Sequence, residues 1–271
     1  MPNGEELLQS KVLLPSITPG YRKTVPGNAR PPIAFGPPRT GTLGELLALN
    51  ALAPIRIVTL APELAGHLDL IREIRASGIV PQIGHTLASY ENGRAALEAG
   101  ARGFTHLFNA MSGLAHRDPG VLTAALAHAE YAELIVDLLH VHPGAILAAL
   151  RCIPRLFCVT DAMAGAGMPD GDYHLGTQKV TKCLGAVRLA DGTLAGSTLT
   201  MERAFQNLVS LGMPLAEASC RTSTYAADYL GVGDRGRIAV GCWADLVVLT
   251  PAVQLLAVYA EGEPIELDDA R

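Results

Sequence analysis

The fold is most limited by a regular alternation of short apolar runs with Ala- and Leu-rich stretches. The runs have the length and composition of buried strands, and the stretches between them have helical spacing. The strand-like runs are 56–60, 79–83, 103–105, 134–136 and 156–159, and the helical stretches are 64–77, 89–99, 118–130, 143–151, 200–211 and 214–230. Because short connections of this kind join parallel strands, the alternation predicts an α/β fold with a parallel sheet, and 271 residues lie within the range of single (β/α)8 barrels.

Three segments depart from this alternation. Residues 1–40 are rich in proline and glycine and show little periodicity. Between Pro169 and Ala195 the apolar period changes to two, and Asp191-Gly192 is a turn signal, so we expect an inserted antiparallel hairpin there. Residues 236–239 and 244–249 look like short strands outside the barrel. The predicted organisation is an irregular segment (1–40), a barrel with an insertion at about 169–195 (41–235) and a C-terminal β appendage (236–271).

Composition supports one large globular domain and excludes several classes of function. Hydrophobic residues make up 49% and charged residues 17% of the chain, which is enough apolar material for a sheet buried on both faces. The net charge is −5 and basic residues do not cluster, so we expect no nucleic-acid partner. Apolar runs are too short to span a bilayer, and the five cysteines lack paired spacings. We therefore expect a cytoplasmic protein without a membrane partner.

Polar residues that can bind a metal or transfer a proton follow the strand-like runs at one relative place. These residues are Glu63, His85, His106, His140 and Asp161. In a parallel barrel such positions meet at the carboxyl-terminal face, where these enzymes place their active sites. Taken singly, each of these residues has an ordinary structural role as an alternative, such as a helix cap for Glu63 or a hydrogen-bonded loop residue for His85. Their recurrence predicts one shared site.

Glu63, His85 and His106 offer one carboxylate and two imidazoles. This donor set suits a single divalent ion and leaves a coordination position for water. We expect Zn²⁺, with Fe²⁺, Co²⁺ or Mn²⁺ as alternatives. Asp161 is the carboxylate expected to collect the proton of that water, and its alternative role is an N-cap.

His140 and His142 form a His-x-His pair, which on a strand would point both rings to one face. Such a pair could itself chelate a metal. Because Glu63, His85 and His106 already form a sufficient ligand set, we expect His140 to polarise the substrate and His142 to be structural.

Two further features can bind a ligand. Arg117, in the segment His116–Gly120, can clamp an anionic group with two hydrogen bonds, and its alternative is a surface ion pair with Asp118. Ala195-Gly196-Ser197 follows a predicted strand, where its small residues let the backbone approach a ligand closely.

Six motifs carry a resemblance to a known family. They are Thr59–Glu63, Gly84-His85-Thr86, Thr105–Met111 with its His-Leu-Phe-Asn-Ala-Met block, His116–Gly120, Val159–Ala162 and Ala195–Met201. In this order they resemble the N-acetylglucosamine-6-phosphate deacetylases of the amidohydrolase superfamily. The resemblance extends from about Gly41 to Glu263.

The resemblance implies hydrolysis of the acetamide of N-acetyl-D-glucosamine 6-phosphate to glucosamine 6-phosphate and acetate. Glu63, His85 and His106 would bind the metal that activates water. Asp161 would act as base and then as acid, and His140 would help to stabilise the carbonyl oxygen in the transition state.

The resemblance also implies the contacts of the sugar phosphate. Asn109, Ala110, His140 and Ala195-Gly196-Ser197 would touch the substrate. Arg117 would hold the phosphate from the neighbouring subunit, because the family is commonly dimeric. A homodimer is therefore expected.

Two differences from the family pattern lead to further expectations. The family has two more barrel strands upstream, so we expect an incomplete barrel whose first two strands are missing. Its open edges would lie at 56–60 and near Leu194, to be covered by residues 1–40 or by a partner chain. The family's Asp-Gly-x-His is Asp137-Leu138-Leu139-His140 here, so either the loop differs or binding is impaired.

Two alternative functions remain open at this point. One is a catalytically impaired homologue with a structural or regulatory role, which the missing strands favour. The other is an amidohydrolase for a different N-acyl or cyclic amide, for which Arg117 would have no phosphate to bind.

Overall fold

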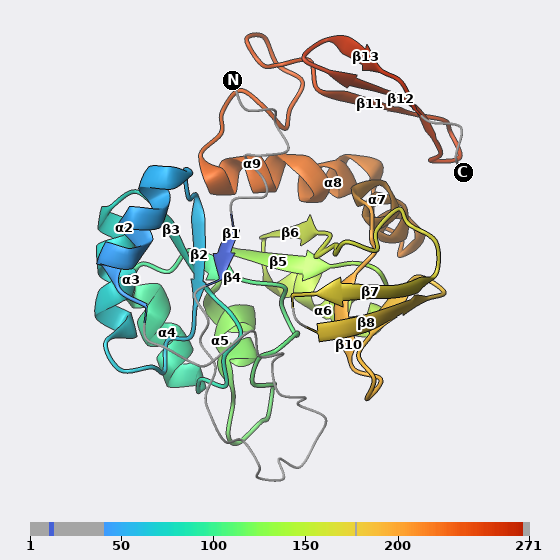
Figure 1. Ribbon diagram of the computed structural model, residues 1–271. Coiled ribbons are helices and arrows are strands. Elements are labelled where there is room, and N and C mark those ends of the chain that lie inside the picture. The colour runs from blue at the N-terminus through green and yellow to red at the C-terminus, as the bar shows by residue number, and fades with distance from the viewer. Residues whose placement is uncertain (1–10, 14–40, 177, 268–271) are drawn as a thin grey trace.

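A six-stranded parallel sheet forms the centre of the computed structural model, which describes residues 11–13, 41–176 and 178–267 (Figure 1). Its strands follow the chain in the order β1-β2-β3-β4-β5-β6. Their bounds are β1 (Lys11–Leu13), β2 (Ile57–Leu60), β3 (Val80–Ile83), β4 (Gly103–Phe104), β5 (Tyr131–Ile135) and β6 (Arg155–Val159). The expected α/β fold with a parallel sheet is confirmed.

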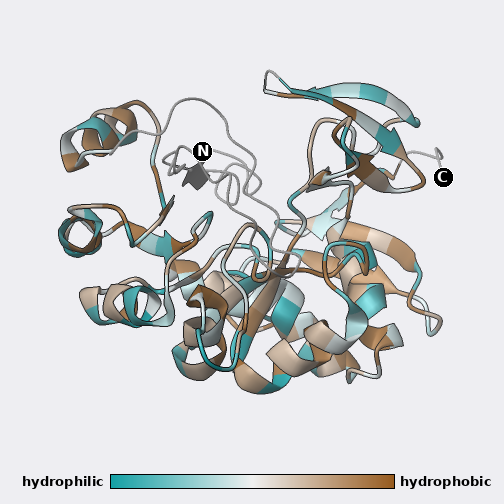
Figure 2. Cartoon of the chain, turned by 90° about the horizontal axis from the view of Figure 1, so that it is seen from below, coloured by the Kyte–Doolittle hydropathy of each residue, from teal (hydrophilic) through white to brown (hydrophobic). Residues whose placement is uncertain are grey.

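Helices connect the strands and cover the outside of the sheet (Figures 1 and 2). They are α2 (Leu43–Leu52), α3 (His67–Ala76), α4 (Tyr90–Ala99), α5 (Val121–His128) and α6 (Pro143–Cys152). In α3 the buried side chains are His67, Leu70, Ile71 and Ile74, which is the spacing of one helix face. Ser89 caps α4 by accepting a hydrogen bond from the backbone N–H of Asn92, and Gly100 ends the helix with φ 112°. Local signals therefore account for these helix ends.

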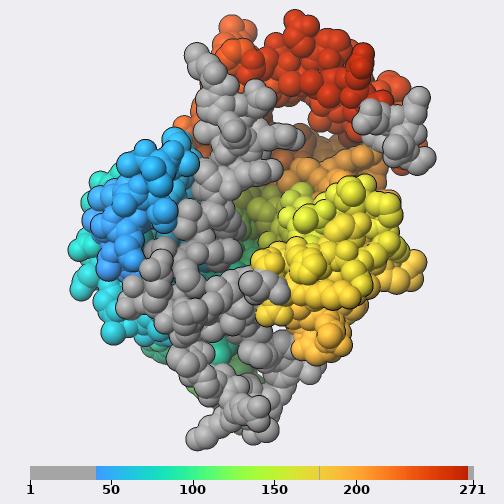
Figure 3. Space-filling model, in the orientation of Figure 1, coloured from blue at the N-terminus to red at the C-terminus, as the bar shows by residue number. Residues whose placement is uncertain are grey.

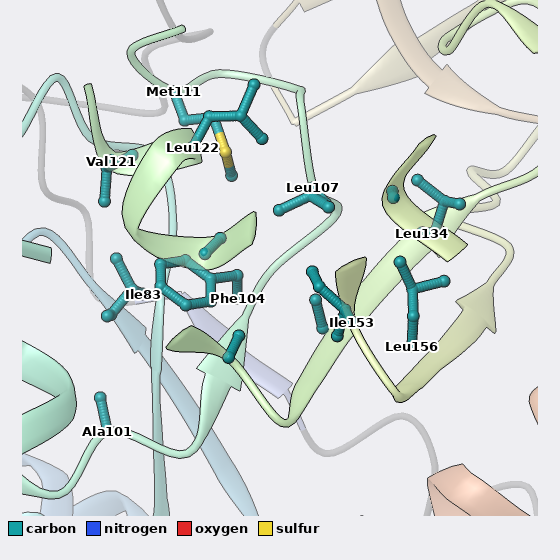
Figure 4. Packing of buried hydrophobic residues seen from close by; sticks show 14 of the residues in the cluster. Ile83, Ala101, Phe104, Leu107, Met111, Val121, Leu122, Leu134, Ile153 and Leu156 are labelled. Carbon is teal, nitrogen blue, oxygen red and sulfur yellow. The ribbon is translucent and has the colours of Figure 1, made fainter. Parts of the chain in front are cut away.

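The main core lies between the sheet and its helices. All residues of β3 and β5 are buried, as expected for parallel strands that are covered on both faces. Figure 4 shows Phe104 of β4 beside Ile83 of β3, with Val121 of α5 close to them. Burying a side chain of this size contributes about 1.5–3 kcal/mol to folding. This packing fixes the ends of β3 and β4, from which two of the predicted site residues follow.

The strand β1 was not expected from the sequence. It pairs parallel with β2, with Lys11 opposite Ile57 and Leu13 opposite Thr59. Its three residues are too few to show a strand period, so the pairing could not be predicted. The rest of the segment 1–40 lies outside the described residues. Even so, β1 covers the edge of β2 that was expected to be open.

A second sheet is formed by the expected antiparallel insertion. Its strands are β7 (Gly171–Leu175), β8 (Gln178–Cys183), β9 (Ala186–Arg188) and β10 (Leu194–Ser197), in the order β10-β9-β8-β7. Asp191-Gly192 forms the predicted turn, with φ 83° at Gly192. The strand near Leu194 was expected to resume the parallel alternation but pairs antiparallel with β9. It still pairs with the segment that follows β6, through a parallel bridge between Ala162 and Ser197.

The C-terminal part combines a helical layer with a small third sheet. The helical layer consists of α7 (Met201–Ser210), α8 (Leu215–Ser219), the π-helical turn η1 (Cys220–Thr224) and α9 (Tyr225–Leu230). The sheet consists of β11 (Leu246–Leu249), β12 (Leu255–Ala260) and β13 (Glu263–Ile265), and it lies at one end of the molecule (Figure 3).

The prediction of a strand over 236–239 is wrong. These residues pair with no neighbouring strand of the described chain, and Gly236 takes a φ of 77° that interrupts an extended backbone. No helix of the described residues is both long and apolar enough to cross a membrane. The five cysteines form no disulfide with one another.

Candidate active site

His85 and His106 meet at the carboxyl edge of the parallel sheet. His85 follows β3 and His106 follows β4, and these strands are neighbours. The two Nε2 atoms lie 2.8 Å apart, and the rings pack edge to face at 4.6 Å between centroids. A neutral imidazole has one donor and one acceptor nitrogen, so this contact requires different proton positions in the two rings. Both rings therefore direct the same nitrogen to one point.

Close packing beneath His85 explains the glycine that precedes it. A Cβ on Gly84 would lie 2.6 Å from Thr105 Cβ and 2.9 Å from Thr59 Cγ2. The hydroxyls of Thr59 and Thr105 are buried and hydrogen-bond to each other at 2.8 Å. The ends of β2, β3 and β4 thus approach one another so closely that only glycine fits at position 84. The sequence motif contained these residues, but their supporting role was missed.

The backbone is unusual at the same edge. Nine non-glycine residues of the described chain have positive φ, and six of them follow strands of the parallel sheet. These six are His85, His106, Phe108, Ala110, Leu138 and Asp161. L-amino acids other than glycine rarely adopt such conformations, and those that do are concentrated at functional sites. The backbone therefore marks the edge that the strand-end residues predicted.

Glu63 is held by the segment that follows His85. Its Oε2 accepts a hydrogen bond from Thr86 Oγ1 at 2.5 Å, and its Oε1 accepts one from the backbone N–H of Leu87 at 3.1 Å. Within the described residues no three His, Cys, Asp or Glu side chains form one metal-binding group. The structure thus brings His85 and His106 into contact and anchors Glu63 to the two residues that follow His85.

Asp161 and the segment Ala195-Gly196-Ser197 are brought together as neighbours. The carbonyl oxygen of Asp161 accepts a hydrogen bond from Ser197 N at 2.8 Å, and Ser197 O accepts one from Met163 N at 2.9 Å. Gly196 has φ 73°, a left-handed conformation that favours glycine. The side chain of Asp161 is exposed. Two groups of predicted site residues therefore share one end of the sheet, although they come from segments far apart in the sequence.

His140 follows β5 and is paired with Asp137. Its Nδ1 lies 2.6 Å from Asp137 Oδ2, and both side chains are less than one-tenth exposed. Burial alone would raise the pKa of Asp137, but hydrogen bonds from the ring and backbone of His140 outweigh it and lower the pKa below its usual value. Asp137 was not among the predicted site residues.

The residues around His140 answer two sequence-based questions. His142 is the N-cap of α6, where its Nδ1 accepts a hydrogen bond from Gly144 N at 3.1 Å, so it has a structural position. Leu138 has φ 65° and packs against the main core. The left-handed conformation suited to glycine is thus present here with leucine.

Asn109 and Ala110 lie in the turn after His106. Asn109 Nδ2 donates hydrogen bonds to His106 O at 3.2 Å and Leu107 O at 3.3 Å. The carbonyl oxygen of Ala110 accepts one from Thr86 N at 3.0 Å. These contacts connect the turn to the segment after His85.

Arg117 is exposed in a loop whose two ends are tied together. Gly120 N donates to Gly113 O at 2.9 Å, and Val121 N donates to Ser112 Oγ at 2.7 Å. Arg117 makes no ion pair with any described residue, so the alternative pair with Asp118 is not observed. The loop presents its guanidinium to the surroundings.

The curated relatives of this chain include deacetylases of two N-acetylated sugar phosphates. No protein-family model matches the sequence. N-acetylglucosamine-6-phosphate deacetylase of Vibrio furnissii is 43% identical over 209 residues, which cover 76% of this chain and 52% of that protein. N-acetylgalactosamine-6-phosphate deacetylase of Escherichia coli O157:H7 is 38% identical over 264 residues, which cover 96% of this chain and 68% of that protein. The chain thus spans about half to two thirds of the length of these curated relatives.

A solved structure of a deacetylase is also similar to this chain. A variant of N-acetyl-D-glucosamine-6-phosphate deacetylase from Mycobacterium smegmatis, in complex with N-acetyl-D-glucosamine-6-phosphate, superposes with a TM-score of 0.78 at 37% identity. The match covers 83% of this chain and 62% of that one.

Proposed function

Because the chain belongs to the family of N-acetylglucosamine-6-phosphate and N-acetylgalactosamine-6-phosphate deacetylases, we propose that it hydrolyses the acetamide of N-acetyl-D-glucosamine 6-phosphate. The products are glucosamine 6-phosphate and acetate. The observation that carries the proposal is the contact of His85 and His106 at the carboxyl edge of β3 and β4. A sugar phosphate is the substrate named for the related enzymes.

Amidohydrolases of this family are metal-dependent, and the residues at the edge fit a divalent ion. Two nitrogens that bind one zinc ion tetrahedrally at about 2.0–2.1 Å lie about 3.3 Å apart, so the observed 2.8 Å between the Nε2 atoms needs only a small opening. Glu63 would supply the third ligand from its place beside Thr86. When bound, the ion acidifies water and polarises a carbonyl group. We propose one ion per chain, with Zn²⁺ favoured.

The other strand-end residues have roles that follow from their chemistry. The exposed carboxylate of Asp161 takes a proton from water and delivers it to the leaving amine. His140 stabilises the charge that develops on the acetyl oxygen. Asn109, Ala110 and Ala195-Gly196-Ser197 contact the sugar.

We propose that Arg117 binds the phosphate across a dimer interface. The guanidinium is exposed and has no described carboxylate partner, which leaves it able to bind an anion from another molecule. A homodimer would place this loop at the neighbouring site.

The proposal is tested by acetate release from N-acetyl-D-glucosamine 6-phosphate, together with the metal content of the purified chain. Arg117→Ala should raise the KM for the phosphorylated sugar about 10-fold or more, and it should change activity on unphosphorylated N-acetylglucosamine little. Arg94→Ala is the matched control, because Arg94 is an exposed arginine on α4. Absence of both metal and acetate would reject the proposed function.

N-acetyl-D-galactosamine 6-phosphate is a second candidate substrate. The relative that covers 96% of this chain acts on that sugar by its name. The two sugars differ only in the configuration at C4, so the ratio of their kcat/KM values measures which one the site prefers. A ratio that favours the galactosamine compound would overturn the choice of substrate but not the reaction.

A further inference from the structure

The loop after β5 is organised around one carboxylate. Asp137 Oδ1 accepts hydrogen bonds from the backbone N–H groups of Leu139 at 2.9 Å and His140 at 2.8 Å. Asp137 Oδ2 lies 2.6 Å from His140 Nδ1. The exposed fractions of the His140 and Asp137 side chains are 7% and 8%, so water competes little for these contacts. Three donors from two consecutive residues thus surround Asp137.

This arrangement determines which nitrogen of His140 carries a proton. An ionised carboxylate can only accept hydrogen bonds, so Nδ1 must donate. The two backbone N–H groups hold Oδ1 and prevent the carboxylate from turning away. No described residue hydrogen-bonds to Nε2 of His140. Nε2 is therefore the ring nitrogen that a bound molecule can reach.

We propose that Asp137 is a positioning residue that keeps Nδ1 of His140 protonated and reserves Nε2 for the substrate. The proposal rests on the proposed function for the identity of that substrate. When the ring carries a second proton, Nε2 donates to the acetyl oxygen. When it does not, Nε2 accepts from a sugar hydroxyl. In both states Nδ1 keeps its proton and donates a hydrogen bond to Asp137. Asp137 therefore controls which hydrogen bonds His140 can make.

Asp137→Asn tests this assignment with little other change. The amide oxygen of asparagine can accept both backbone hydrogen bonds in place of Oδ1. Its NH₂ group then faces Nδ1 of His140, and two donors cannot share one hydrogen bond. The neutral ring must therefore move its proton to Nε2. Turning the amide over would instead lose both backbone hydrogen bonds.

The proton positions are read from two-bond ¹H–¹⁵N correlation spectra of protein labelled at histidine nitrogens, with His140 assigned by its loss in His140→Gln. The wild-type chain should show a protonated Nδ1 for His140 at every pH between about 6 and 9. His142 serves as an internal reference, because its Nδ1 accepts from Gly144 N and must be unprotonated when the ring is neutral. Asp137→Asn should show His140 protonated at Nε2 instead.

Activity provides a second and separate reading. Asp137→Asn should lower kcat by about 10- to 100-fold with a smaller change in KM, because the carboxylate that favours the charged ring is lost and a neutral Nε2–H is a weaker donor to the acetyl oxygen. Asp172→Asn is the matched control, because Asp172 is an exposed aspartate that pairs with Lys179 on the antiparallel sheet.

An unprotonated Nδ1 in the wild-type chain would overturn the proposal, and this measurement needs no variant to fold. A protonated Nδ1 that persists in folded Asp137→Asn would also overturn it. If no acetate is released by the wild-type chain, the proposed function fails while the spectra still decide the role of Asp137.

Discussion

The hydroxyl of Thr86 donates a hydrogen bond of 2.5 Å to Oε2 of Glu63 and so joins the end of β2 to the segment after β3. The same hydroxyl accepts a hydrogen bond from Ala88 N at 3.0 Å, which fixes its direction. Thr86 also follows His85 directly in the sequence. Together with the backbone N–H of Leu87, this hydroxyl therefore holds the Glu63 carboxylate against the segment that follows His85.

Thr86→Val should weaken metal binding. Valine keeps the shape of threonine but cannot donate to Glu63, and removing a hydrogen bond that orients a ligand typically lowers metal affinity about 10- to 100-fold. The Kd for Zn²⁺ is measured by competition with a coloured chelator. Thr86→Ser should keep most of the affinity, and Thr181→Val, an exposed threonine on β8, should change nothing. Equal loss in Thr86→Ser, which keeps the hydroxyl, would contradict the assignment of the effect to the hydrogen bond with Glu63.

Asp161→Asn should keep the metal and lose activity. Asparagine cannot take up a proton, and general acid–base catalysis contributes roughly 10²- to 10⁴-fold to kcat. Elemental analysis and acetate release are measured on the same preparation. Asp69→Asn, at an exposed position on α3, is the control. Loss of metal in Asp161→Asn would make Asp161 a ligand rather than the base.

Gly84→Ala should destabilise the fold. The added methyl group would lie 2.6 Å from Thr105 Cβ, so neighbouring atoms must move, and such overpacking costs about 1–3 kcal/mol. Urea unfolding gives the free energy of unfolding. Gly233→Ala is the control, because nothing lies within 4 Å of a Cβ built there. If both variants unfold at the same urea concentration, the ends of β2, β3 and β4 can relax more than their contacts indicate.

The contribution of Asp137 to stability should depend on pH. Its pKa is lowered in the folded chain, since hydrogen bonds from His140 outweigh the effect of burial. A lowered pKa stabilises the folded state at pH values above the unfolded pKa of about 3.9, and this stability is lost as the pH falls through the folded pKa. The free energy of unfolding of Asp137→Asn should therefore fall below that of the wild-type chain at pH 7, and this difference should shrink as the pH falls below about 3.9. A difference that stays constant with pH would contradict the lowered pKa.

The parallel sheet and the histidine pair could be predicted because they depend on repeated local patterns. His85 and His106 follow apolar runs, and parallel strands bring such positions to one edge whatever the details of packing. The strand expected over 236–239 was wrong for the opposite reason. Its apolar residues fit a strand locally, but a strand also needs a neighbouring backbone, which the local pattern does not reveal.

The supporting residues could not be predicted from their types. Thr86 and Asp137 are common polar residues that satisfy turns and caps in most proteins. Their roles depend on distances between segments, such as the 2.5 Å from Thr86 Oγ1 to Glu63 Oε2, which are fixed only when the sheet has formed. The φ of 65° at Leu138 was indicated in part, because the resemblance placed glycine there.

The left-handed backbone at His85, His106 and Asp161 makes stability and chemistry favour different residues at the same positions. Glycine there would relieve roughly 1–2 kcal/mol of backbone energy per position, while removing a side chain that the proposed reaction uses. A screen that selects only for thermal stability would therefore tend to erase the site one residue at a time. Stabilised variants of this chain should be sought away from these three positions.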